Sequence, residues 1–182
     1  MTSIPDHRSI ITTLIDSWKD ALDQINPAEL EGFESLLRQS RRVFITGAGR
    51  SGLVVKACAN RLMHLGLTVH IVGEVTTPAI GEGDVLVVAS NSGTTPGPVH
   101  SATVAATVGA RVVALTSTPD SPLAALADCV ITIPSVSTQI PLPLGTFFEQ
   151  NLFIVLESCI VHLQRRFDIP ESALKDRHAN ME

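Results

Sequence analysis

Aromatic side chains and long apolar runs are scarce in this chain of 182 residues. Aromatics make up 4% of the sequence, although 45% of it is hydrophobic, so the apolar content is mostly Val, Ile, Leu and Ala. That composition is typical of strands buried in a parallel sheet. No apolar run reaches the length that spans a membrane, and the N-terminus lacks the charged-then-apolar pattern of a secretory signal. We therefore expect a soluble, cytoplasmic protein without membrane partners.

Runs of positive charge and paired cysteines are also missing. The formal net charge is −5 and no Lys or Arg cluster occurs, which argues against a nucleic-acid partner. An anionic ligand would have to be captured by local donors, because the long-range field has the wrong sign. Cys58, Cys129 and Cys159 form no C-x-x-C pair, which favours a reducing compartment and excludes the usual structural zinc pattern. Asp and Glu show no metal-ligand spacing, so we expect no metal.

What the chain does have is a regular alternation of strand and helix patterns. Residues 4–39 are helical in pattern and form an N-terminal segment (1–40) of one domain that covers 1–182. In the α/β core and C-terminal helices (41–182), strands are predicted at 42–46, 68–72, 84–89, 111–115 and 129–133, and helices at 51–65, 96–108, 123–127 and 146–167, with a last short helix after Pro170. Repeated βα units predict an α/β fold with a doubly wound five-stranded parallel sheet.

Two loops follow strands of this predicted sheet, where open parallel sheets bind ligands. The first, Gly47–Gly52 (GAGRSG), matches G-x-G-x-x-G between a strand and a helix, and Glu74 lies where a ribose-binding acid would stand. A nicotinamide dinucleotide is therefore a rival ligand. Against it, the chain is too short for a separate catalytic domain, and the second loop, Ser90–Thr95 (SNSGTT), stays unexplained.

The second loop carries four hydroxyls and a glycine in six residues. Neutral donors at a helix N-terminus favour a phosphate monoester. The alternative is a plain Ser/Thr helix cap, which accounts for one hydroxyl. The candidate substrate- and phosphate-binding residues are Gly49, Arg50, Ser51, Ser90, Asn91, Ser92, Thr94 and Thr95. For Arg50 a surface salt bridge is the alternative role.

Several segments together resemble the sugar isomerase (SIS) family and, within it, the 6-phospho-3-hexuloisomerases. The matching segments are GAGRSG at 47–52, RLMHLG at 61–66, VGEVTTP at 72–78, SNSGTT at 90–95, PLGTFFEQ at 143–150 and RHANME at 177–182. The serine loop marks the wide family, and the combination is narrower. Asn91 departs from the glycine that is frequent there in hexuloisomerases.

The resemblance implies a flavodoxin-like strand order, phosphate binding by Ser90, Ser92 and Thr95 with Ser51 near by, and no cofactor. It implies a phosphorylated sugar as substrate: 3-hexulose 6-phosphate and fructose 6-phosphate would interconvert through an enediol, as in the ribulose monophosphate pathway. It further implies a homotetramer with shared active sites. An isomerase of another sugar phosphate and a non-catalytic sugar-phosphate sensor remain alternatives.

Glu149, His178 and His64 are the candidate catalytic residues. Glu149 lies in the first turn of the long helix and is the candidate base, although a carboxylate there also complements the helix dipole. His178 lies in a polar tail that is ordinarily solvent-exposed; the resemblance favours a proton donor or shuttle that reaches a neighbour's site. His64 ends a helix, where histidine is favoured electrostatically in any case. We expect one of these histidines to assist opening of the fructose ring.

Overall fold

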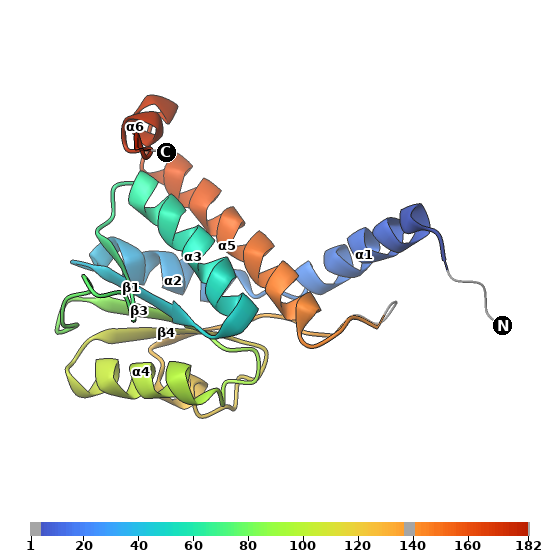
Figure 1. Ribbon diagram of the computed structural model, residues 1–182, viewed down its shortest axis with the longest axis horizontal. Helices are drawn as coiled ribbons and strands as arrows, with labels where there is room; N and C mark the ends of the chain where they lie inside the picture. The colour runs from blue at the N-terminus through green and yellow to red at the C-terminus, as the bar shows by residue number, and fades with distance from the viewer. Residues whose placement is uncertain (1–4, 137–140, 182) are drawn as a thin grey trace.

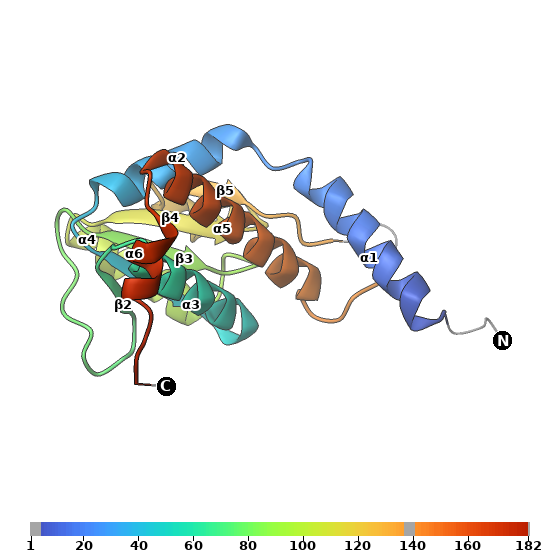
Figure 2. The same cartoon turned by 90° about the horizontal axis from the view of Figure 1, so that it is seen from above.

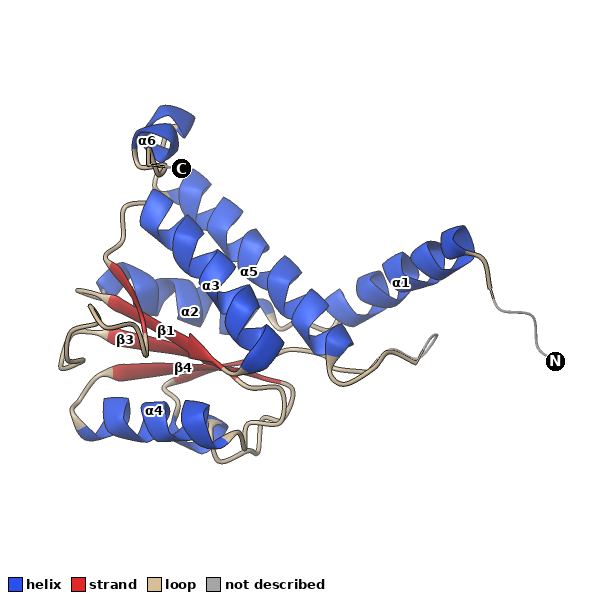
Figure 3. Ribbon diagram, in the orientation of Figure 1, coloured by secondary structure: helices blue, strands red, loops and turns tan. Residues whose placement is uncertain are grey.

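A five-stranded parallel sheet lies between helices in the computed structural model, which describes residues 5–136 and 141–181 (Figures 1 and 3). The strands are β1 (Val43–Gly47), β2 (Val69–Ile71), β3 (Val85–Ala89), β4 (Arg111–Thr116) and β5 (Cys129–Thr132). Their order is β2-β1-β3-β4-β5, and every neighbouring pair is parallel. The predicted doubly wound sheet and its flavodoxin-like order are confirmed.

The helices cover the sheet unequally. They are α1 (His7–Leu22), α2 (Pro27–Gln39), α3 (Gly49–His64), α4 (Pro96–Thr107), α5 (Thr146–Arg166) and α6 (Glu171–Asp176). In Figure 1, α2, α3 and α5 lie over one face and α4 lies under the other. The short helix predicted at 123–127 is a 3₁₀ turn, Ala124–Leu126.

Each central strand contributes to two separate hydrophobic clusters. Ile45 and Val87 belong to the cluster beneath α2, α3 and α5, whereas Phe44 and Leu86 belong to the cluster over α4. Side chains alternate across a strand, so a strand covered on both faces has to be apolar throughout. This is why β1 and β3 read as continuous runs of Val, Ile, Leu and Phe in the sequence.

Helix α1 extends away from the rest of the chain (Figures 1 and 2). Its contact with α5 includes a hydrogen bond from Trp18 Nε1 to Gln150 Oε1 (3.1 Å). Two apolar side chains on α1, Ile11 and Ile15, are 57% and 53% exposed. Across the described part of the chain, each helix is too short or too polar to cross a membrane.

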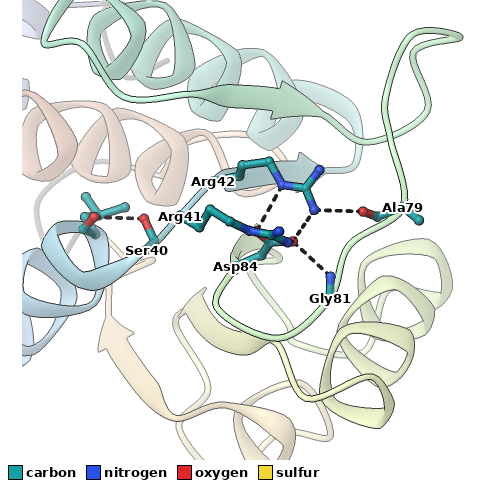
Figure 4. A network of polar contacts seen from close by, with 7 residues as sticks. Ser40, Arg41, Arg42, Ala79, Gly81 and Asp84 are labelled. Carbon is teal, nitrogen blue, oxygen red and sulfur yellow. Dashed lines mark hydrogen bonds and ion pairs between the residues drawn. The ribbon is translucent and has the colours of Figure 1, made fainter.

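A buried carboxylate organises the opposite, amino edge of the sheet (Figure 4). The side chain of Asp84 is inaccessible and lies 2.6 Å from Arg42 Nη2, which also donates to the Ala79 carbonyl. Arg41 and the Gly81 N–H donate to the same carboxylate. Burial by itself would raise the pKa of Asp84, but these hydrogen bonds outweigh it and lower the pKa to about 2. The network fixes the connection between β2 and β3.

Replacing this carboxylate should destabilise the fold in a pH-dependent way. The folded pKa of Asp84, about 2, lies below its ordinary value of 3.8, so the stabilisation is complete above about pH 4 and fades as the pH falls. We expect Asp84→Asn to lower the free energy of unfolding by about 2 kcal/mol at pH 7 and by about half as much at pH 3, measured by urea unfolding.

The matched control is Glu171→Gln. Glu171 pairs with Lys175 at 2.9 Å, but both side chains are exposed, so this change should cost less than about 0.5 kcal/mol. A loss for Asp84→Asn that is no larger than the control, or that is independent of pH, would contradict the role assigned to Asp84.

Candidate functional site

Three helices that begin at the carboxyl edge of the sheet have no side-chain caps. The N-cap residues of α3, α4 and α5 are Ala48, Thr95 and Gly145, and none of them makes a side-chain cap hydrogen bond. Helix α2 also begins at this edge, where Glu29 accepts a hydrogen bond from the Thr132 N–H at the end of β5, but it is capped by Asn26. Free N–H groups and converging helix dipoles favour an anion at this edge.

The hydroxyls of the loop between β3 and α4 pair with each other. Ser90 Oγ lies 2.9 Å from Thr95 Oγ1, and Ser92 Oγ lies 2.8 Å from Thr94 Oγ1. Ser90 is buried, whereas Ser92 and Thr94 are exposed. Because Thr95 bonds Ser90 instead of capping α4, the simple cap interpretation is wrong for this residue. The loop forms a small cluster of hydroxyls that an anion can reach.

The first turn of α4 makes these hydroxyls more important. Pro96 and Pro98 both lie there and have no N–H, which removes two of the donors that a helix N-terminus ordinarily offers. An anion at this loop therefore depends more on side-chain hydroxyls than an anion at an ordinary helix start.

The glycine turn between β1 and α3 is closely packed. Gly49 has a φ of +56°, and a Cβ on Gly52 would lie 2.5 Å from the Gly47 carbonyl oxygen. Ser51, on the first turn of α3, is buried. The turn therefore needs its glycines for close approach of the backbone, whichever ligand it binds.

Asn91 connects the hydroxyl loop to its neighbours. Its carbonyl oxygen accepts hydrogen bonds from Ser117 N (3.0 Å), Ser117 Oγ (2.9 Å) and Thr116 Oγ1 (3.0 Å). Its amide lies against Gly145, where a Cβ would be 3.1 Å from Asn91 Nδ2. The sequence interpretation missed Thr116 and Ser117. Their signal was a run of hydroxyls at the end of β4, at the same edge of the sheet.

Glu149 and Arg50 meet at this edge. Glu149 lies in the first turn of α5 with its side chain 11% exposed, and Arg50 Nε is 2.6 Å from its Oε2. No hydrogen bond from a described residue reaches Oε2, so the contact is an ion pair without an aligned donor. The predicted alternative for Arg50, a salt bridge, is thus present, but its partner is the candidate base.

The two candidate histidines lie elsewhere in the same chain. The rings of His64 and His178 stack with their centroids 5.3 Å apart. His64 ends α3, fifteen residues after Gly49, so it lies about 20 Å along the helix from the end near Glu149. Figure 1 shows α6 and the C-terminus at this far end of the α3–α5 pair. Within one chain the structure does not bring either histidine to Glu149.

The C-terminal tail is docked on the end of α3. Arg177 Nη1 donates to the His64 carbonyl (3.0 Å), where a cation complements the helix dipole. Burial lowers the pKa of His64, and the nearby His178 and Arg61 lower it further. These surroundings therefore favour the neutral imidazole of His64.

The structure does not gather the residues that a nicotinamide dinucleotide or a metal ion would need, within the part of the chain that it describes. Glu74, the predicted ribose acid, is exposed and pairs with Lys56 at 3.6 Å. Among residues 5–136 and 141–181, no three His, Cys, Asp or Glu side chains gather as the ligands of a metal ion would.

The chain is similar to known proteins over most of its length. A profile of the SIS domain matches residues 36–148. The chain belongs to the SIS-domain family. A 3-hexulose-6-phosphate isomerase from Mycobacterium gastri is 46% identical over 92% of this chain and 87% of its own length. The Bacillus subtilis 3-hexulose-6-phosphate isomerase is 32% identical over 94% of this chain and 97% of its own length. The predicted resemblance to the SIS family and its hexuloisomerases is confirmed.

A solved structure is similar over nearly its whole length. A Methanococcus jannaschii protein, whose crystal structure infers a molecular function of 3-hexulose-6-phosphate isomerase, superimposes with a TM-score of 0.85. It is 27% identical, and the match covers 96% of this chain and 99% of that one. The structural similarity therefore extends beyond the residues that the profile matches.

The glycine turn of this SIS domain can be tested with one methyl group. We expect Gly52→Ala to lower the free energy of unfolding by about 2 kcal/mol, because the methyl has to displace the Gly47 carbonyl. Gly97→Ala is the matched control: its Cβ meets nothing within 4 Å, and it lies in a helix, so it should be neutral or slightly stabilising. Equal effects in thermal or urea unfolding would contradict the packing described here.

Proposed function

We propose that this chain is an isomerase that interconverts 3-hexulose 6-phosphate and fructose 6-phosphate through an enediol. The curated relatives that carry this activity in their names match nearly the whole chain. The observation that carries the proposal is that the hydroxyl loop, Ser90–Thr95, lies against the start of α5, the helix that carries Glu149: a Cβ on Gly145 would be 3.1 Å from Asn91 Nδ2. In this proposal the loop binds the phosphate, and Glu149 moves a proton between C2 and C3 of the sugar.

The spacing of these two parts suits a hexulose phosphate. Asn91, inside the loop, lies against Gly145, and Glu149 follows Gly145 by about one helical turn. In the substrate, C4, C5 and C6 separate the phosphate from the reacting carbons, C2 and C3. A sugar whose phosphate binds the loop therefore extends toward α5 with its reacting carbons near Glu149.

The isomerisation needs one base for the proton on carbon. It also needs one proton added at O3 and one removed from O2. Glu149 takes the proton from C2 of the 3-keto sugar, the C2–C3 double bond forms, and O3 accepts a proton to give the enediol. Return of the proton to C3 on the same face, with loss of the O2 proton, leaves the carbonyl at C2. The uncapped N–H groups of α3 and α5 are donors for the charge that develops on the oxygens.

The active form is proposed to be a homotetramer. The exposed apolar face of α1, which includes Ile11 and Ile15, has no cover within its own chain in the part that the structure describes. A groove of 670 Å³ beside Glu149 is lined by Trp18 and by exposed apolar side chains of α3 and α5, including Leu53. Association through such surfaces would exclude water from the base and bring a neighbour's His178 within reach.

The base assignment predicts a specific loss. Glu149→Gln should lower turnover about 10²- to 10⁴-fold and still bind fructose 6-phosphate, because the phosphate donors are untouched. Turnover is followed by NMR of the fructose 6-phosphate equilibrium, and binding by thermal shift. Glu157→Gln, two turns later on α5, is the control and should keep normal turnover. Near-normal turnover of Glu149→Gln would remove this residue as the base, and binding without turnover in the unmodified protein would favour a sensor.

Shared active sites predict complementation between inactive variants. If His178 serves a neighbour's site, Glu149→Gln and His178→Ala are each impaired alone, but mixed subunits contain some sites with both native residues. Random pairing would restore about a quarter of the sites. The measurement is turnover after co-refolding of the two variants. Activity no higher than the mean of the separate variants would contradict shared sites.

A further inference from the structure

The ion pair between Arg50 and Glu149 covers the candidate base. Arg50 Nε lies 2.6 Å from Oε2 of Glu149, an oxygen to which no described residue gives a hydrogen bond. The Glu149 side chain is 11% exposed, so the guanidinium stands where a substrate would approach it. A carboxylate oxygen that a guanidinium occupies at this distance cannot also approach a C–H group of the substrate. The ion pair therefore corresponds to an inactive state of the base, before substrate binds.

Arg50 is also a neighbour of the phosphate site. Gly47 pairs with Ala89 in the β1–β3 ladder, so the glycine turn and the hydroxyl loop leave the sheet side by side. A Cβ on Gly47 would lie 3.2 Å from the Ala89 carbonyl oxygen, which shows how closely the two loops start. The Arg50 side chain is 62% exposed, so solvent surrounds most of it. A guanidinium binds phosphate with two parallel hydrogen bonds, and a phosphate monoester carries nearly two charges against the one of a carboxylate.

We propose that Arg50 is a phosphate-responsive positioning residue. It holds Glu149 while the site is empty, and it turns to the phosphate when substrate binds, which frees Glu149 for proton transfer. The inference rests on the proposed function, and it adds a reason for substrate choice: a sugar without a phosphate leaves the base covered. Glu149 and the bound anion therefore compete for one guanidinium.

Competition of this kind is measurable without turnover. Inorganic phosphate is titrated by calorimetry into the unmodified protein, Glu149→Gln, Arg50→Gln and the double variant. Glu149→Gln should bind phosphate about fivefold more tightly, because Arg50 no longer has to leave a carboxylate. Arg50→Gln should bind more weakly, and the double variant should show no gain over Arg50→Gln. Arg50→Lys, which keeps the charge and loses the planar fork, should recover part of the affinity.

Two results would overturn the proposal. One is an unchanged phosphate affinity in Glu149→Gln. The other is the same gain in the double variant, which would mean that Glu149 simply repels the anion. The outcome is separate from that of the proposed function, since absence of fructose 6-phosphate conversion by the unmodified protein would refute the isomerase while the four phosphate affinities still decide the role of Arg50.

Discussion

The pairing of β1 with β3 is the constraint on which the rest of the site depends. Their register runs from Val43 opposite Val85 to Gly47 opposite Ala89, so both strands end at the same level. From this level, α3 departs over one face of the sheet and α4 over the other (Figure 1). The order β2-β1-β3 makes this the point at which the chain changes direction across the sheet. Diverging loops at such a point leave a crevice, which is where doubly wound sheets bind ligands.

The second constraint is how α5 enters this crevice. Leu144 and Gly145 both have positive φ values, 42° and 73°, and turn the chain into the helix. The fully buried Asn151 donates to the Pro134 carbonyl (2.9 Å) and ties the helix to the end of β5. With the start of α5 held in this way, Glu149 has a fixed backbone opposite Arg50. A carboxylate that is to act on a defined carbon needs such support.

Features that depend on local sequence pattern could be predicted from the sequence alone. Continuous apolar runs predicted the strands, because a strand that is buried on both faces carries apolar side chains at nearly every position. The glycine turn and the hydroxyl loop were recognisable because they follow those strands directly. The ion pair of Arg50 with Glu149 and the stack of His64 on His178 were not predictable from periodicity. Each joins residues about a hundred positions apart, and only the packing of α3 on α5 and α6 brings them together.

The site also shows why local rules can mislead. Thr95 is at an N-cap position, yet its hydroxyl bonds Ser90, and the prolines behind it reduce the donors of α4. Similarly, the helix-end position of His64 would suit a charged imidazole, but burial and nearby positive groups lower its pKa. In both cases the neighbours that decide the role come from other parts of the chain.

The most direct test of the central claim is a crystal structure of the Glu149→Gln variant with fructose 6-phosphate bound. The account predicts the phosphate on the hydroxyls of Ser90–Thr95, with C2 and C3 of the sugar beside position 149. A phosphate bound at the amino edge near Arg41, or a sugar directed away from α5, would contradict it.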